Sequence, residues 1–109
     1  MLTRWGETLD KTAVLQEYPR PQLVRERYYN LNGLWDYAIT ASDACPGAWD
    51  GEILVPFSPE APLSGVDRTL KPGQVLWYRR TLPLEKPDGG RMLLHVGAAD
   101  QRAWVDVNG

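Results

Sequence analysis

The fold is decided by the stretch Leu34–Thr40, which reads LWDYAIT. Large apolar side chains alternate with smaller or polar ones, so Trp35, Tyr37 and Ile39 share one face of an extended chain. Asp36 then lies on the opposite face. The alternation predicts a half-buried β-strand in which Trp35 is an anchor of the core.

Four more strands are predicted further along the chain. Each is a short run of β-branched, aromatic or aliphatic residues, and clusters of Gly, Pro, Asp and Ser separate the runs. Pro56 restricts the first of them to an edge or a strand end, because proline cannot donate a ladder hydrogen bond. The four predicted strands are Ile53–Phe57, Val75–Leu82, Arg91–Ala98 and Arg102–Val107.

The last predicted strand runs directly into Asn108-Gly109. This dipeptide favours a type I′ hairpin turn, which needs positive φ at both central residues. A hairpin turn delivers a second strand, and the 109 residues hold none after it. We therefore expect an open sheet edge at Arg102–Val107 and self-association of the chain through it. The apolar residues expected to point inward are Met92, Leu94, Val96, Ala103, Val105 and Val107.

The chain divides into an arm and one domain. Residues 1–27 lack a clean periodicity, and Pro19 and Pro21 stiffen them, so we predict an extended N-terminal arm with a short helix around Thr12–Glu17. Residues 28–109 form the domain and include the long loop Ser58–Gln74. Strands without helices indicate an all-β antiparallel sandwich or barrel, and about five strands are fewer than the roughly eight of a jelly roll.

Composition narrows the classes of function. Lys and Arg number 12 against 14 Asp and Glu, which gives a net charge of −2, and no basic block is present. We therefore expect no nucleic-acid partner and no membrane partner. The first residues lack the apolar core of a signal peptide, and Cys45 is the single cysteine. These features favour the cytoplasm.

Little in the sequence points to catalysis. One Cys and one His cannot form a tetrahedral metal site alone, so neither a metal nor a cofactor is expected. Cys45 has no base near it in sequence, and His95 is interpreted as a hydrogen-bonded structural residue within a strand. The acid pairs that could meet in space are Asp50 with Glu52 and Asp36 with Asp100. Fourteen acids in 109 residues is an ordinary surface density, so two acids that meet are no sign of a catalytic pair. We therefore assign no catalytic residue to this chain.

Tryptophan and tyrosine are enriched over phenylalanine. The chain has five Trp and five Tyr but one Phe. Both types combine a large apolar face with a polar group, which suits sheet faces, interfaces and sugar stacking. Trp49 and Trp104 are the candidates for stacking on a sugar, and packing within a sandwich is the alternative for each.

The order of five motifs resembles the N-terminal sugar-binding-type domain of glycoside hydrolase family 2, which contains β-galactosidases, β-glucuronidases and β-mannosidases. The resemblance covers residues 15–109. The motifs are LNGLWDY at 31–37, ILVPFS at 53–58, LWYRRT at 76–81, LLHVGAAD at 93–100 and WVDVNG at 104–109.

The resemblance implies a partial, galactose-binding-like jelly roll. In the family, an immunoglobulin-like domain and a (β/α)₈ barrel follow this domain, and the barrel holds both catalytic glutamates. A barrel takes about 250 residues, so neither glutamate belongs to this chain. The loop after the Val-Pro step can reach the sugar in family members, which makes Ser58 and Glu60 candidate substrate-binding residues. The alternative for Ser58 is a turn cap, and Asp100 is expected to hold a turn at a strand end.

Three functions therefore stand at this stage. The first is a non-catalytic N-terminal part of a retaining exo-β-glycosidase, which meets its carbohydrate substrate through the parent enzyme and serves as scaffold and pocket wall. The second is a lectin-like carbohydrate-binding module. The third is a purely structural β-sandwich.

Overall fold

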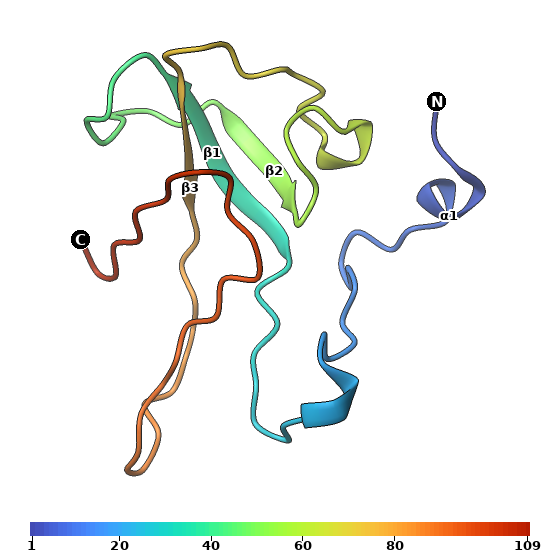
Figure 1. Cartoon of the computed structure of the whole chain (residues 1–109), viewed down its shortest axis with the longest axis vertical. Helices are drawn as coiled ribbons and strands as arrows, with labels where there is room; N and C mark the ends of the chain where they lie inside the picture. The colour runs from blue at the N-terminus through green and yellow to red at the C-terminus, as the bar shows by residue number, and fades with distance from the viewer.

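A three-stranded antiparallel sheet organises the chain, which a computed structural model describes over residues 1–109. The strands are β1 (Gly33–Thr40), β2 (Gly51–Val55) and β3 (Val75–Arg79), and their order in the sheet is β2-β1-β3 (Figure 1). A one-turn helix α1 (Arg4–Glu7) and two 3₁₀ turns, η1 (Pro21–Leu23) and η2 (Pro62–Ser64), are the only helical elements. None of these helices has the length or apolar character needed to cross a bilayer.

The first three predicted strands are confirmed, with changed ends: β1 begins one residue earlier, β2 lies two residues earlier, and β3 ends three residues earlier than predicted. The second strand ends at Val55 because Pro56 follows it and cannot donate a ladder hydrogen bond. The pairing also confirms that Trp35, Tyr37 and Ile39 share a face, since Trp35 lies opposite Ile53 and Tyr37 opposite Tyr78.

The prediction of strands at Arg91–Ala98 and Arg102–Val107 is wrong for this structure. Both segments are irregular, and every residue from 88 to 109 is exposed. A strand is stable only when another backbone pairs with it, and no segment of the chain pairs with these two. Asn108 and Gly109 do have positive φ, 61° and 97°, as the turn prediction requires, but no strand leads into them.

The core is small and lies around β2. Only six of 109 residues are buried, and the apolar ones include Ile53, Leu54 and Ala38. Val14 of the arm is also buried at 1% exposure, because the side chains of Asn30 and Asn32 donate hydrogen bonds to the carbonyls of residues 14 and 15. The arm therefore contributes to the core through a single apolar side chain.

Trp35 is half-buried, so its role as an anchor is smaller than predicted. Its indole N–H donates to the Leu31 carbonyl over 2.8 Å, and its ring meets Tyr78 edge-on at 6.4 Å between ring centres. In β1 the fully buried residue is Ala38, on the opposite face.

The helix expected around Thr12–Glu17 does not form. Asp10 closes a turn there, because its carboxylate accepts hydrogen bonds from both the backbone and the hydroxyl of Thr12. The arm's α-helix instead begins after Thr3, whose hydroxyl accepts from the Gly6 backbone N–H and caps it.

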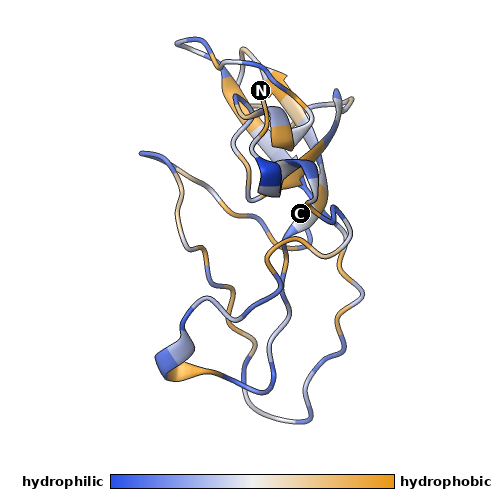
Figure 2. Ribbon diagram, turned by 90° about the vertical axis from the view of Figure 1, so that its right-hand side faces the viewer, coloured by the Kyte–Doolittle hydropathy of each residue, from blue (hydrophilic) through white to orange (hydrophobic).

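The chain as a whole leaves much of its surface uncovered. Its accessible surface is 9490 Å², against about 6,100 Å² for a compact monomer of this mass. Its radius of gyration is 15.6 Å, against about 13 Å for a compact domain of this length. Figure 2 shows the reason: long irregular loops extend away from the sheet and carry apolar residues in the open.

Candidate functional site

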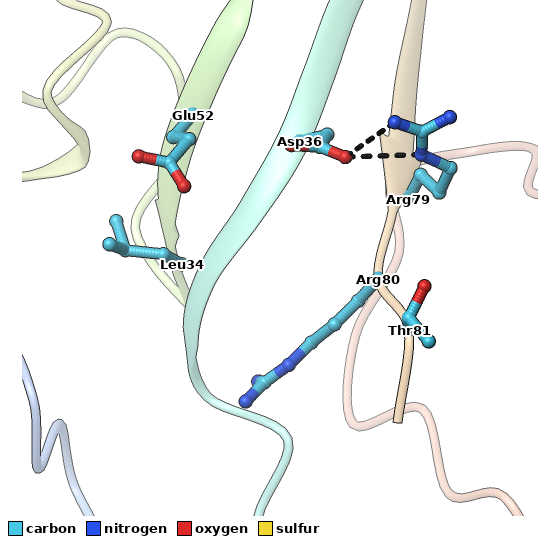
Figure 3. Close-up of a pocket in the computed structure, with 6 residues that line it drawn as sticks. All are labelled: Leu34, Asp36, Glu52, Arg79, Arg80 and Thr81. Carbon is cyan, nitrogen blue, oxygen red and sulfur yellow. Dashed lines mark hydrogen bonds and ion pairs between the residues drawn. The ribbon is translucent and has the colours of Figure 1, made fainter. Parts of the chain in front are cut away.

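A shallow polar pocket lies on one face of the sheet. It has a volume of about 290 Å³. The strand register produces it, since Asp36 of β1 lies directly opposite Glu52 of β2 on one side and Arg79 of β3 on the other. Figure 3 shows this row of three charged side chains crossing the sheet. The remaining lining residues are Leu34, Arg80 and Thr81.

Arg79 is the most constrained member of this row. Its Nε and Nη2 both donate to Asp36 Oδ2, at 3.1 and 2.7 Å. The same guanidinium lies 4.4 Å from the ring centre of Trp49, where a cation–π contact adds to the ion pair. Because Arg79 and Asp36 are both well exposed, the pair contributes only about 0.2–1 kcal/mol to stability.

Glu52 is the free carboxylate of the pocket. It forms no ion pair, and it lies opposite the like-charged Asp36, an arrangement that is unfavourable unless a cation offsets it. Arg79 supplies that cation. The row can accept hydrogen bonds through Glu52 and donate them through the remaining N–H groups of Arg79, as a polar, hydroxyl-rich ligand requires.

Arg80 lines the pocket but serves the fold. Its Nη1 donates to the carbonyls of Leu31 and Asn32, at 2.6 and 3.0 Å, and its guanidinium lies 5.9 Å from the Trp35 ring centre. In Figure 3 its side chain extends away from Arg79 toward the start of β1. Arg80 thus ties the end of β3 to the segment that leads into β1.

In the acid pairs named from the sequence, Asp50 and Asp36 each bind another group. The Asp50 side chain bonds to the backbone of β1, since its Oδ2 accepts from the Ile39 N–H at 2.8 Å. Asp36 pairs with Arg79, whereas Asp100 lies in an exposed irregular segment where its carbonyl accepts from the Arg102 N–H. The backbone of Asp100 thus closes a tight turn, but its carboxylate forms no hydrogen bond and the strand end that it was expected to hold does not form.

Ser58 and Glu60 are brought together, at a place separate from the polar pocket. Both are exposed, and interactions with its own backbone N–H, the Ser58 hydroxyl and the Leu70 backbone lower the pKa of Glu60. Burial, together with the negative charge of Glu60, raises the pKa of Tyr78 on β3. Sequence reasoning missed Tyr78, because only the fold of the long loop brings Glu60 to β3.

The loop Ser58–Gln74 contains the single 3₁₀ turn η2 and is partly closed. Ser64 is buried at 2% exposure, and its hydroxyl donates to the Ala61 carbonyl and accepts from the Val66 N–H. The Arg68 N–H closes the loop onto the Pro59 carbonyl at 2.8 Å. These bonds hold the segment that carries Glu60 in one shape.

The two candidate stacking residues differ in environment. Trp49 is half-buried and has Arg79 against its ring, so a sugar could stack only on its other face. Trp104 is 78% exposed and takes part in no aromatic or cation–π contact. Sequence reasoning missed the contact between Trp49 and Arg79, which joins the loop before β2 to the polar row.

The single His and Cys lie apart from the pocket. His95 is exposed, irregular and without a hydrogen bond, so its interpretation as a bonded residue within a strand is wrong; the strand expected to hold it does not form. Cys45 is a free, exposed thiol. No three His, Cys, Asp or Glu side chains gather as a metal site would require.

Comparison with known proteins adds no assignment. A scan of known protein families finds none that matches this sequence, and a search of curated proteins finds no relative.

Proposed function

We propose that this chain is the non-catalytic N-terminal part of a cytoplasmic, retaining exo-β-glycosidase of glycoside hydrolase family 2. In that enzyme it would form part of a jelly-roll domain that acts as scaffold and as one wall of the substrate pocket. One observation carries the proposal: residues 91–107 have the alternation of strands, yet they lie uncovered. They are strand sequences that find no partner within this chain.

The side chains of this segment support the scaffold role. Met92, Leu94 and Val96 are 48–57% exposed, and Val107 is 75% exposed. Such a concentration of exposed apolar side chains in one short segment is unusual for a monomeric protein. Strands and domains from a larger protein would cover it, which agrees with the five ordered motifs of the sequence.

The absence of a complete catalytic pair supports the non-catalytic role. Retaining glycosidases use two carboxyl groups about 5–5.5 Å apart, one as nucleophile and one as acid. In the pocket Asp36 is bound to Arg79, which leaves Glu52 as a single free carboxylate. The chemistry is therefore assigned to the barrel of the parent enzyme.

In the proposed enzyme, residues 58–60 form the wall of the substrate pocket, which is separate from the polar pocket on the sheet. Ser58 and Glu60 are both exposed, and the bonds around Ser64 fix the shape of the loop that follows them. A hydroxyl and a carboxylate held at the surface can accept hydrogen bonds from sugar hydroxyls once another domain faces them.

A lectin-like module is the second candidate. The observation in its favour is the exposed ring of Trp104, together with the free face of Trp49 beside the polar row. The fluorescence of a tryptophan changes when a sugar stacks on its ring. Under this alternative, titration with a β-galactoside therefore shifts the tryptophan fluorescence of the 109-residue chain, and Trp104→Ala abolishes the shift. Under the scaffold proposal, sugar leaves the fluorescence unchanged.

The test compares two lengths of the same gene product. The 109-residue chain and the product of its complete reading frame are each assayed on nitrophenyl β-galactoside, β-glucuronide and β-mannoside. We expect the short chain to hydrolyse none of them and the complete product to hydrolyse at least one. A reading frame that ends after Gly109, or a complete product without activity on all three, would refute the proposal.

A further inference from the structure

The outer edge of β3 carries backbone groups that no other segment satisfies. In β1 the carbonyl of Tyr37 accepts from the Asp50 N–H, and the Ile39 N–H donates to the Asp50 side chain, so odd-numbered residues direct their backbone toward β2. Even-numbered residues therefore bond to β3, through their partners Val75, Trp77 and Arg79. The N–H and C=O groups of Leu76 and Tyr78 must then point away from the sheet. No backbone hydrogen bond joins β3 to a segment other than β1.

The two edges of the sheet differ in their protection. At β2 one outward-pointing group, the carbonyl of Leu54, accepts from the Phe57 N–H, and Pro56 follows the strand, so the end of that edge is protected. At β3 the charges that could guard the edge are used within the chain: Arg79 binds Asp36, and Arg80 binds the Leu31 and Asn32 carbonyls. Charge, proline and bulges are the usual protection of an edge, and β3 itself has no proline.

We propose that the β3 edge binds the β3 edge of a second copy of this chain. An antiparallel pair centred on Trp77 places Leu76 of each copy opposite Tyr78 of the other. These two residues carry the outward-pointing backbone groups, so the pair forms four new backbone hydrogen bonds. The result is an isologous dimer with one continuous sheet of order β2-β1-β3-β3-β1-β2.

The side chains of this register are compatible with one another. Trp77 meets Trp77 across the two-fold axis, and Leu76 packs beside Tyr78, both favourable cross-strand combinations. Val75 lies opposite Arg79 of the second copy, so no two like charges are opposed. A shifted register that placed Arg79 opposite Arg79 of the second copy would bring two positive charges together and is therefore disfavoured.

The chain has uncovered surface, part of which lies on β3. It exposes about 3,400 Å² more than a compact monomer of its mass. On β3 itself the Tyr78 side chain is 41% exposed.

Sedimentation velocity of the 109-residue chain under reducing conditions tests the proposal, since reduction prevents cross-linking through Cys45. We expect a concentration-dependent equilibrium between monomer and dimer. Leu76→Pro removes an outward N–H without removing a bond to β1 and should abolish the dimer, whereas Leu76→Ala, its matched control, keeps the N–H and should dimerise. A wild-type chain that remains monomeric throughout, or equal dimerisation of the two variants, would overturn the proposal.

A charge pair at position 75 tests the register even if the proline variant fails to fold. Val75→Lys opposes Arg79 of the second copy and should weaken the dimer, whereas Val75→Glu faces the same arginine and should strengthen it. Because the contact occurs twice in the dimer, the two dissociation constants should differ by at least about 5-fold. Equal constants, or the opposite order, would refute the register. The outcome does not depend on glycosidase activity of a longer gene product, so the two proposals can fail separately.

Discussion

Leu34 and Leu54 face each other across β1 and β2, yet their environments differ. Leu34 is 50% exposed and Leu54 is 2% exposed. Replacement of each by alanine is therefore the same chemical change made once at the surface and once in the core. The comparison tests whether the small core around β2 holds the sheet together.

The expected losses follow from burial. A buried Leu→Ala substitution costs about 2–5 kcal/mol, because the lost transfer free energy and the cavity add together. At the half-exposed site no closed cavity remains, and about half of the roughly 1.5–3 kcal/mol for burial of a leucine is lost, which is about 1 kcal/mol. Leu54→Ala should therefore destabilise the chain at least about twice as much as Leu34→Ala.

Urea denaturation at one fixed protein concentration, followed by far-UV circular dichroism and tryptophan fluorescence, measures both losses. A fixed concentration is needed because dimerisation would shift the apparent stability. Equal losses for the two variants, or a larger loss at Leu34, would refute the assignment of the core to β2.

Three other predictions concern the site. Ser64→Ala leaves the half-buried Val66 N–H without its acceptor and should cost about 0.5–1.5 kcal/mol, and protease cleavage near Arg68 or Lys71 should accelerate; an unchanged cleavage rate would show that Ser64 does not hold the loop. Burial raises the pKa of Tyr78 most, and the charge of Glu60 raises it further, so Glu60→Gln should lower that pKa, as followed by tyrosinate absorbance with Tyr78→Phe as the reference. An unchanged pKa would show that Glu60 does not act on Tyr78. The pKa of Tyr78 is higher in the folded chain than in the unfolded chain. Neutral Tyr78 therefore contributes to the free energy of unfolding below its unfolded-state pKa, and this contribution is lost as pH rises through its folded-state pKa. Tyr78→Phe should abolish this loss of stability at high pH. Asp36→Asn should cost about 0.2–1 kcal/mol in urea, and Glu52→Gln should cost nothing or stabilise slightly, because it relieves a like-charge contact; the reverse order would contradict the described row.

The sheet could be predicted where a strand carries its own signal. Alternation in 34–40 gave β1 and its shared face, and the paired runs gave β2 and β3. The segments 91–98 and 102–107 were predicted as strands on the same grounds, but pairing is a property of two segments, and no segment of the chain pairs with them. Ala38 was missed as a core residue for a related reason: a small side chain shows no preference until its neighbours close over it.

The candidate site was harder to predict than the strands. Ser58 and Glu60 follow from their loop position, but their link to Tyr78 depends on how the loop folds back. The polar row depends on the register of both strand pairs, which sets Asp36 beside Glu52 and Arg79. Register between segments separated by long loops is not written in either segment alone.

Hydrogen exchange of the segment 91–107 tests the central claim most directly. The claim is that this segment is strand sequence that lacks its partner in the 109-residue chain and pairs within a longer protein. Amides of 91–98 and 102–107 should exchange nearly freely in the short chain, while those of β1 are protected, and they should become protected in the product of the complete reading frame. Protection of these amides in the short chain, or free exchange of them in the longer product, would contradict the account.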